Sequence, residues 1–275
     1  MRLQLMDYLC CPSCNGNFET NIKEGLEGEV IEGVLECCEC KRRFEIKKGL
    51  PNLNFPENLE ESDRDEQIFY DRLAPMYDLR SRTSQLRLGN WEYFLFNTRA
   101  RQPLIKGLEL KKNYSVLDTG TGTGISLSII AKLVGEGGQL HGSDISRRML
   151  EVAQKKMKTK GVRAELLLAN ASYLPYRTGV FEAVLHIGGL NTFTDKKRAI
   201  KEMYRVAKPG SKIVCCDEGL RPGKEKTWFG RTALKKEPKL YSSKPPLEFV
   251  PDKIEDLKVY WIWGGLSWVI EFRKQ

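Results

Sequence analysis

Apolar runs of strand length alternate with amphipathic helical patterns through the second half of the chain. The strand-like runs are Val116–Leu117, Gln139–Asp144, Ala164–Leu168, Phe181–His186 and Lys212–Asp217. The helical patterns are Ile125–Val134, the segment that follows Ser146 and Thr194–Val206, with apolar residues recurring every three or four positions. Helices that alternate with apolar strands are typical of a mostly parallel sheet covered on both faces. The pattern therefore predicts an α/β fold with a doubly wound sheet.

The residues before this alternation show a different pattern. Residues 57–65 are polar and lack any periodicity, so we interpret them as a linker. A helix is predicted from Glu66, and Pro75 is expected to interrupt it because proline has no backbone N–H. A further helix is predicted over Ser84–Lys106. Together, residues 66–107 are expected to form the helices that precede the sheet.

A glycine-rich loop follows the first predicted strand. It contains Asp118, Gly120, Gly122 and Gly124, and the second strand ends in an acid, Asp144, 20 residues after Gly124. Glycines permit a tight turn and a close approach of backbone N–H groups to a ligand, while a carboxylate can accept both hydroxyls of a ribose. This layout predicts a nucleotide site and leaves open whether the ligand is a dinucleotide.

Four segments in this order resemble the class I S-adenosylmethionine-dependent methyltransferases. They are Asp118–Gly124, Asp144-Ile145-Ser146, Asn170–Tyr176 (similar to "D-A-x-x-L-P-F") and Arg205–Ser211 (similar to "R-V-L-K-P-G-G"). The resemblance implies a seven-stranded Rossmann-like sheet over residues 66–275 and S-adenosylmethionine as the cofactor. It also implies cofactor contacts from Tyr77, Asp118, Gly120, Thr121, Gly122, Gly124, Asp144, Ile145, Asn170, Ala171 and His186. Asn170 replaces the usual Asp, which keeps an acceptor oxygen and loses a charge.

The helix before the sheet narrows the resemblance. "F-Y-D-x-x-A-x-x-Y-D" at Phe69–Asp78 is similar to the leading helix of UbiE/COQ5-like methyltransferases. The resemblance implies that residues 66–107 fold over the cofactor as a lid and that the methyl acceptor is a small molecule. A packing stripe at helical spacing would give the same pattern. Catalytic residues stay unassigned, because methyl transfer from a sulfonium releases a neutral thioether and requires mainly alignment. His186, Asn191 and Asp217 follow strand ends and are weak candidates.

The carboxy-terminal region adds two expectations. Tyr260–Trp263 and Leu266–Phe272 flank a Gly-Gly pair, which predicts a tight antiparallel hairpin. Residues 221–257 before it are rich in proline, basic residues and aromatic residues. We interpret this insertion as the selector of the methyl acceptor, although an irregular surface connection would have the same composition.

Six of the eight cysteines lie in the first 40 residues. Two C-x-x-C pairs, Cys11/Cys14 and Cys37/Cys40, supply four thiolates, the ligand set of a closed structural zinc site. Cys10 and Cys38 could each replace a neighbour as ligand or form a redox pair. We favour the first four because strand-like residues precede each pair. Residues 1–56 resemble the Trm112-like zinc-ribbon family, which implies structural Zn²⁺ and a role in contacting a protein partner.

Composition leaves two alternative functions open. The chain carries a formal charge of +9, but residues 1–56 hold 7 Lys/Arg against 9 Asp/Glu. A four-cysteine module before this fold also resembles the bacterial rRNA guanine-N1 enzymes, so RNA is an alternative acceptor; the acidic ribbon argues against it. A non-enzymatic zinc-ribbon protein that retains cofactor binding is the second alternative. No transmembrane run or signal peptide is evident, so we expect a cytoplasmic protein.

Overall fold

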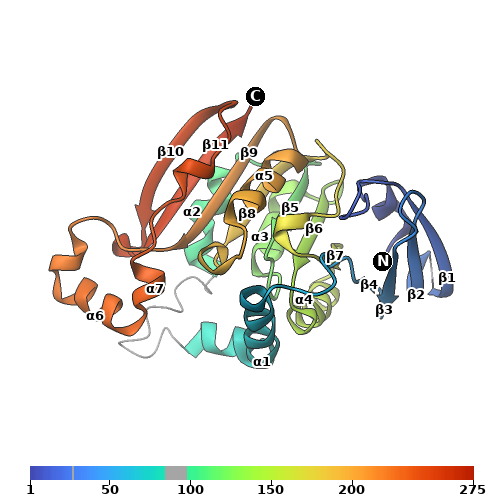
Figure 1. Ribbon diagram of the computed structural model, residues 1–275, viewed down its shortest axis with the longest axis horizontal. Helices are drawn as coiled ribbons and strands as arrows, with labels where there is room; N and C mark the ends of the chain where they lie inside the picture. The colour runs from blue at the N-terminus through green and yellow to red at the C-terminus, as the bar shows by residue number, and fades with distance from the viewer. Residues whose placement is uncertain (27, 84–97) are drawn as a thin grey trace.

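The computed structural model describes residues 1–26, 28–83 and 98–275. These described residues form a small antiparallel sheet at the amino terminus and a larger mixed sheet of seven strands (Figure 1). The small sheet has the strand order β1-β2-β3-β4, with β1 at Phe18–Leu26, β2 at Glu29–Cys37, β3 at Arg43–Lys47 and β4 at Leu50–Pro51. Each pair of neighbours in it is antiparallel, as a zinc ribbon requires.

The larger sheet has the order β10-β11-β9-β8-β5-β6-β7. Its strands are β5 (Ser115–Thr119), β6 (Gln139–Asp144), β7 (Glu165–Leu168), β8 (Phe181–Ile187), β9 (Ala207–Glu218), β10 (Ile254–Ile262) and β11 (Ser267–Lys274). Strands β5 to β9 are parallel, and β11 lies antiparallel between β9 and β10. The expected doubly wound, Rossmann-like sheet is confirmed, and β10 and β11 form the predicted hairpin.

Helices cover both faces of the larger sheet, and alternate strand residues enter different cores. One core joins α2 (Thr98–Gly107), α3 (Ile125–Val134) and α4 (Arg147–Thr159) to strand residues such as Val116. The other joins α5 (Lys196–Val206) and the zinc ribbon to strand residues such as Leu117. Val116 and Leu117 are both fully buried, which explains why β5 is apolar at consecutive positions.

Local sequence signals account for the ends of several helices and strands. Helix α3 and strand β6 begin and end where the pattern predicts. Ser146 caps α4 by accepting a 3.1 Å hydrogen bond from the backbone N–H of Met149. Asp195 caps α5 in the same way through Arg198 N–H at 2.8 Å. Strand β9 begins at Ala207, five residues before the predicted Lys212, because the turn that was expected after α5 is part of the strand.

Helix α1, at Glu61–Thr83, corrects two expectations. It begins inside the predicted linker 57–65, where Glu61 and Asp63 in its first turn suit the positive end of the helix dipole. It also continues through Pro75 instead of stopping there. Burial of Ala74 and Tyr77 against α4 stabilises the helix on either side of the missing hydrogen bond. Of the predicted helix Ser84–Lys106, residues 84–97 lie outside the described residues, and α2 occupies the rest.

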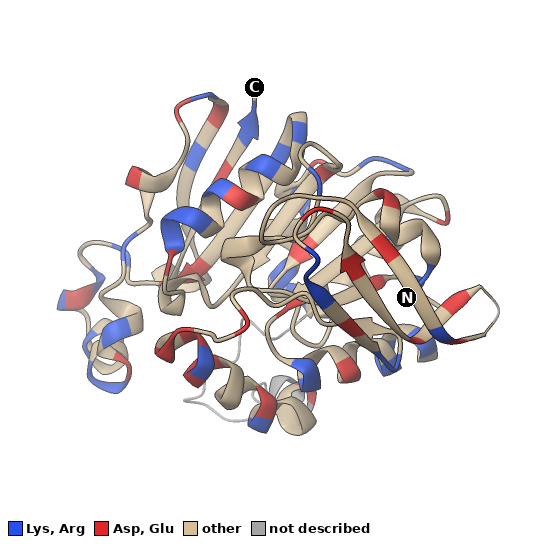
Figure 2. Ribbon diagram, turned by 45° about the vertical axis from the view of Figure 1, so that its right-hand side comes forward, with Lys and Arg blue, Asp and Glu red and all other residues tan. Residues whose placement is uncertain are grey.

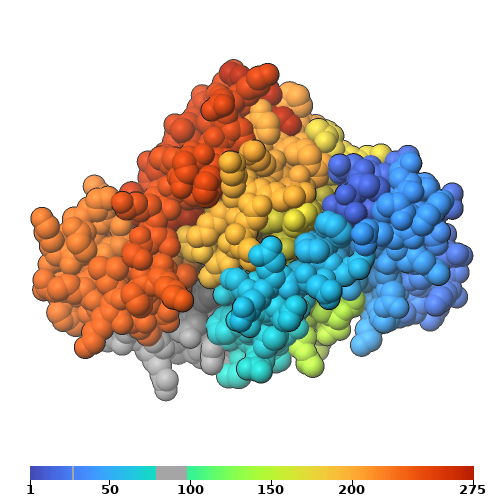
Figure 3. All heavy atoms as spheres, in the orientation of Figure 1, coloured from blue at the N-terminus to red at the C-terminus, as the bar shows by residue number. Residues whose placement is uncertain are grey.

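The zinc ribbon packs on the β7 edge of the larger sheet and shares a core with it (Figures 1 and 3). The backbone N–H of Leu53 donates to the carbonyl of Leu168 at 2.9 Å. The ring of Tyr8 lies 4.3 Å from that of His141, measured between ring centroids, and contacts the ring of Phe181 as well. The boundary predicted at residue 56 therefore separates two sheets joined by one hydrophobic core.

The insertion after β9 folds as a separate helical cluster. It contains α6 (Trp228–Lys236) and α7 (Pro238–Tyr241), which pack on Leu266 at the start of the last strand. Residues 254–257 belong to β10, so the irregular segment is shorter than the predicted 221–257. None of the helices in the described part of the chain has the length and apolar character needed to cross a bilayer.

Candidate functional site

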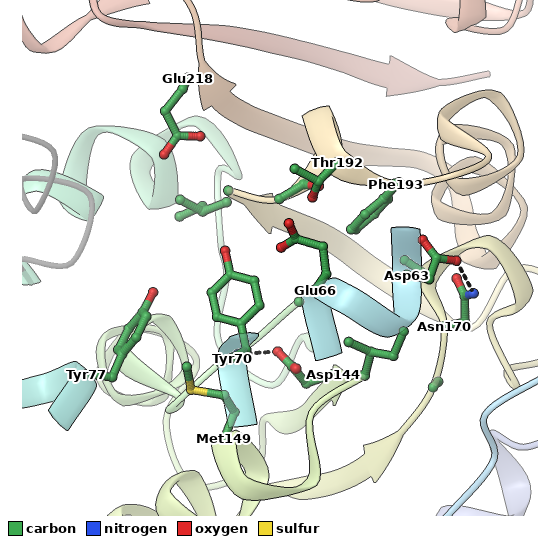
Figure 4. A pocket seen from close by; sticks show the side chains of 18 of the residues that line it. Asp63, Glu66, Tyr70, Tyr77, Asp144, Met149, Asn170, Thr192, Phe193 and Glu218 are labelled. Carbon is green, nitrogen blue, oxygen red and sulfur yellow. Dashed lines mark hydrogen bonds between the residues drawn. The ribbon is translucent and has the colours of Figure 1, made fainter. Parts of the chain in front are cut away.

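A cavity opens at the carboxyl ends of β5, β6, β7, β8 and β9, and α1 lies over it (Figure 4). This edge is where ligands bind in open α/β sheets. The described residues that line the cavity are Asp63, Glu66, Tyr70, Tyr77, Arg101, Gly120, Gly122, Asp144, Ile145, Met149, Ala169, Asn170, Ala171, Ile187, Gly188, Gly189, Thr192, Phe193 and Glu218. In the space-filling view, α1 crosses the middle of the molecule between the ribbon and the insertion (Figure 3).

The glycine loop after β5 forms the floor of the cavity. Gly120 and Gly122 have φ angles of 68° and 56°, which favour glycine. A Cβ at Gly120 would lie 3.2 Å from the ring of His186, so the floor has no room for a side chain there. The N–H of Gly122 donates to Asp144 Oδ2 at 2.7 Å, and Asp144 Oδ1 accepts from the N–H of Ser146 at 2.9 Å. The acid and the loop are therefore held together at the cavity.

Three predicted cofactor residues shape the loop from behind. Thr121 Oγ1 donates to Asp118 Oδ2 at 2.7 Å, and the N–H of Thr121 donates to the carbonyl of Ser143 at 2.9 Å. Gly124 has φ of 73° and sits at the start of α3. Burial raises the pKa of Asp118 to about 6, partly offset by the positive charge of Arg101. Asp118, Thr121 and Gly124 are outside the cavity lining, so their role is to fix the course of the loop.

The residues that were predicted to border the adenine of the cofactor line the cavity wall. Ile145, Asn170 and Ala171 all line it, as do Tyr77 and Asp144. The Asn170 side chain accepts a hydrogen bond from Ser172 N–H at 2.9 Å and donates one to Asp63 of α1 at 3.0 Å. The Asn that departs from the family pattern thus joins the sheet to the helix above it.

The three weak catalytic candidates do not reach the cavity lining. His186 is fully buried under the loop, with Nδ1 2.9 Å from the carbonyl oxygen of Thr119, and burial lowers its pKa. Asp217 is also fully buried and accepts a 2.6 Å hydrogen bond from the N–H of Asn191. Asn191 donates its side-chain amide to the carbonyl of Glu218 at 2.8 Å. All three brace the strand ends.

Helix α1 supplies lining residues that the sequence did not indicate. Asp63 and Glu66 fall in or beside the predicted linker, and their acidic composition resembled a solvated segment. The helix is held over the cavity by Gln67, whose amide donates to the carbonyl of Ile145 at 2.8 Å. Asp71 accepts from Ser146 Oγ at 2.6 Å and from the N–H of Arg148 at 3.1 Å. Only the "F-Y-D" motif around Asp71 could have indicated these contacts.

The cavity is acidic although the chain is basic. Asp63, Glu66, Asp144 and Glu218 line it together with a single lining base, Arg101, among the described residues. Lys and Arg instead gather along the outer face of α5 (Figure 2). Burial and the neighbouring acids raise the pKa values of Glu66 and Glu218, that of Glu218 well above its usual range. The lining therefore favours a neutral or cationic ligand over an anionic one.

The four predicted cysteine ligands converge at one end of the ribbon. The Sγ atoms of Cys11, Cys14, Cys37 and Cys40 all lie within 4.8 Å of one another. The Cys11–Cys40 and Cys14–Cys37 Sγ distances are 3.7 and 3.5 Å. A tetrahedral Zn²⁺ with Zn–S bonds of about 2.3 Å has S···S edges of about 3.8 Å, so the cluster fits such an ion.

The two other ribbon cysteines are not part of this cluster. Cys10 is buried, with its Sγ 3.8 Å from Asn15 Oδ1, and Cys38 is partly buried. β2 ends at Cys37 as predicted, whereas a 3₁₀ turn at Leu3–Asp7 and an isolated bridge at Leu9 precede Cys11 in place of the expected strand. The positions of the Sγ atoms therefore favour Cys11, Cys14, Cys37 and Cys40 over Cys10 and Cys38 as the ligand set.

Comparison with known proteins gives two family matches. The ubiE/COQ5 methyltransferase family matches residues 70–223, and the Trm112p-like protein family matches residues 2–49. The demethylmenaquinone methyltransferase of Anoxybacillus flavithermus is 37% identical over 118 residues, 42% of this chain and 50% of the relative. The ubiquinone/menaquinone biosynthesis C-methyltransferase UbiE of Haemophilus ducreyi is 39% identical over 107 residues, 38% of this chain and 41% of the relative. The chain thus spans about half the length of these curated relatives.

Solved structures agree on the fold. Geranyl diphosphate C-methyltransferase from Streptomyces coelicolor A3(2) superposes with a TM-score of 0.62 at 12% identity, covering 80% of this chain and all of that one. At that identity the likeness concerns the fold alone. The family match, in contrast, extends over more than half of the sequence and includes the glycine loop, Asp144 and the Asn170 segment. The chain therefore belongs to the ubiE/COQ5 methyltransferase family.

Proposed function

We propose that this protein is an S-adenosylmethionine-dependent methyltransferase that methylates a ring carbon of a small quinone-type acceptor. The observation that carries the proposal is the cavity floor, where the backbone of Gly120 and Gly122 meets Asp144 at the edge of the parallel strands. Membership of the ubiE/COQ5 family supports it, as do relatives named for demethylmenaquinone and for ubiquinone and menaquinone biosynthesis.

The lining fits the methyl donor without side-chain obstruction. A Cβ at Gly122 or Gly188 would meet nothing within 4 Å, so a ligand can approach the backbone closely at both positions. Asp144 would accept the ribose hydroxyls, and Ile145, Asn170 and Ala171 would border the adenine. When bound, the donor supplies an electrophilic methyl on a cationic sulfur, and its leaving thioether is neutral.

The protein's own contribution is alignment and exclusion of water. Helix α1 covers the cavity, and Tyr70 and Met149 line it with Ile187 and Phe193 as large, mostly apolar side chains. Such a lining holds an aromatic acceptor beside the donor and keeps competing water away. The predicted role of the insertion as acceptor selector stays a prediction, since none of its described residues is part of the lining.

Zinc in the ribbon is the second part of the proposal. Four thiolates without an open coordination position make a structural site, which would hold the ribbon against the sheet rather than act on substrate. Metal binding would supply folding free energy to a segment with a small core of its own. Contact of the ribbon with a protein partner and RNA as acceptor also stay predictions.

The test combines binding and transfer. Calorimetry should show S-adenosylmethionine binding to the purified protein at about one site per chain. Labelled methyl should then enter demethylmenaquinone that has been reduced to the quinol with dithionite. Incorporation into RNA instead of the quinol would replace the proposed acceptor class, and binding without transfer to quinol, RNA or protein fractions would favour the non-enzymatic alternative.

A further inference from the structure

Glu218 is the last residue of β9, and its side chain points into the cavity (Figure 4). Glu66 of α1 enters the same space from the opposite wall, so two carboxyl groups from elements 152 residues apart share it. Among the described residues no lysine or arginine forms an ion pair with either group. Their recorded side-chain partners are uncharged or acidic, Thr192 for Glu66 and Asp217 for Glu218, and both groups line the space that a ligand would fill.

The acid next to Glu218 in the sequence, Asp217, is surrounded by backbone hydrogen-bond donors. Asp217 is fully buried and is not part of the cavity lining, and its carboxylate accepts the N–H groups of Gly189 at 3.4 Å, Asn191 at 2.6 Å and Glu218 at 2.8 Å. Three backbone donors stabilise a negative charge on Asp217. Burial and the adjacent Asp217 raise the pKa of Glu218, which makes Glu218 a stronger proton acceptor. We therefore expect the two adjacent carboxyl groups, Asp217 and Glu218, to have different roles, because their surroundings differ.

We propose that Glu218 is the catalytic base of the methyl transfer, taking the hydroxyl proton from a phenolic acceptor such as a hydroquinone. Glu66 is a positioning residue that faces it and adds negative charge. The inference rests on the proposed function and adds the residue that removes the proton of the acceptor. An acidic lining suits such a neutral acceptor beside a cationic donor.

The step is balanced without an oxidant or reductant. The acceptor's O–H bond breaks, and its proton passes to Glu218. The electron pair moves through the ring to the carbon beside the hydroxyl-bearing carbon, which forms the new C–C bond to the methyl group while the S–CH₃ bond breaks. Loss of the proton on that ring carbon to water restores the aromatic ring, and Glu218 returns the first proton to the ring oxygen, which regenerates the hydroxyl and the carboxylate. The products are the methylated hydroquinone, a neutral thioether and one proton.

A second consequence concerns binding of the donor alone. Burial and the charges of Asp217 and Glu66 hold the pKa of Glu218 well above its usual range, which favours the protonated carboxyl in the free protein. A cation in the cavity favours the ionised carboxylate. Binding of S-adenosylmethionine near pH 7 should therefore release part of a proton, which calorimetry in buffers of different ionisation enthalpy measures without any turnover.

The decisive variant is Glu218→Gln, which keeps the size of the side chain and removes the base. We expect kcat with the reduced demethylmenaquinone to fall about 100- to 10,000-fold, with a smaller change in KM. Proton release on donor binding should fall as well. Raising the pH, or using an acceptor with a more acidic hydroxyl, should recover part of kcat because the phenolate then forms without the base. Glu66→Gln should lower kcat by less than Glu218→Gln does and move the acidic limb of the pH profile to lower pH, because a negative charge facing Glu218 is lost.

The matched control is Glu225→Gln, on an exposed 3₁₀ turn outside the cavity, which should behave as the parent protein. A Glu218→Gln protein with kcat within twofold of the parent and unchanged proton release would overturn the inference, as would a loss confined to KM. Failure of the parent protein to bind the donor or to methylate the quinol would instead refute the proposed function.

Discussion

The side-chain amide of Asn170 donates a 3.0 Å hydrogen bond to Oδ2 of Asp63, across 107 residues of sequence. Both side chains are buried, and Asp63 Oδ1 accepts from the N–H and the hydroxyl of Thr194 at 3.1 and 3.0 Å. Asp63 thus ties α1 to two loops at the cavity edge. An aspartate in place of Asn170, the residue type that the family pattern has there, would place two carboxylates against each other. The Asn is therefore matched to the acid in the helix.

The hydrogen bond between Asn170 and Asp63 predicts how stability and donor affinity change when Asn170 is replaced by the Asp of the family pattern. Asn170→Asp should lower the free energy of unfolding by about 1–3 kcal/mol, because the amide donor is lost and like charges meet in a buried place. Affinity for S-adenosylmethionine should fall with it, since α1 is held less firmly over the cavity. Urea unfolding and calorimetry measure the two effects.

The exchanged pair provides the control. In the double variant that combines Asp63→Asn with Asn170→Asp, the amide introduced in α1 retains an oxygen for Thr194 and offers its NH₂ to the carboxylate introduced in the loop. That carboxylate can still accept from Ser172 N–H, as the Asn170 oxygen does in the parent. The double variant should recover most of the lost stability and affinity. A double variant as unstable as the sum of its single changes would show that the pair does not couple.

Asp144 is predicted to contribute more to donor binding than to the fold. Asp144→Ala removes the acceptor for Gly122 N–H and the expected partner of the ribose, and one charge-assisted hydrogen bond contributes about 1.5–3 kcal/mol. Affinity for S-adenosylmethionine should fall at least tenfold by calorimetry. Asp195→Ala, which removes the cap of α5 outside the cavity, is the matched control and should leave affinity unchanged. Equal affinity in parent and Asp144→Ala proteins would refute the assignment of this acid.

The pKa values of two buried acids predict how stability and donor affinity depend on pH. Burial raises the pKa values of Asp118 and Asp144 to about 6. Because the folded state binds more protons than the unfolded state between about pH 4 and 6, these groups make stability fall as pH rises through that interval. Asp118→Asn should remove part of the fall, which urea unfolding at pH 4, 5, 6 and 7 would measure. Donor affinity has the opposite trend and should weaken below about pH 6, where Asp144 becomes protonated.

The sequence predicts elements whose determinants are local. Helix α3 and strand β6 follow from apolar runs bounded by glycine and by an acid, and Ser146 has the residue type of a helix cap. The mostly parallel arrangement of the larger sheet follows from the alternation of such elements. Pro75 shows the limit of local reasoning, because packing of α1 on α4 outweighs the penalty that proline imposes.

The cavity lining could be predicted only in part. Gly120 and Gly122 lie in one short sequence motif, and Asp144 and Ile145 lie in another, so the sequence alone could indicate them. Glu66 and Arg101 come from helices whose place over the sheet depends on contacts between distant segments, which no local pattern encodes. His186 was expected near the reacting methyl, but successive residues of a strand point to opposite faces, and the next residue, Ile187, lines the cavity instead.

Zinc should stabilise the larger sheet as well as the ribbon. Leu5 and Leu35 of the ribbon belong to the same hydrophobic core as Trp268 of β11, which is fully buried. All five tryptophans of the chain lie outside residues 1–56, so tryptophan fluorescence reports the larger domain. The parent protein should contain about one zinc per chain by elemental analysis. Removing the metal with a chelator should lower the unfolding midpoint seen by fluorescence, by about 2–4 °C for each kcal/mol lost.

Adjacent cysteines make the zinc prediction specific. Cys40→Ser removes one thiolate from the cluster and should lower both zinc content and the unfolding midpoint. Cys38→Ser changes a thiol outside the cluster two residues away and should retain both. Equal zinc loss in the two variants would contradict the ligand set. A fluorescence midpoint that does not respond to metal removal would show that the ribbon unfolds independently, because a shared core transmits the loss of either part to the other.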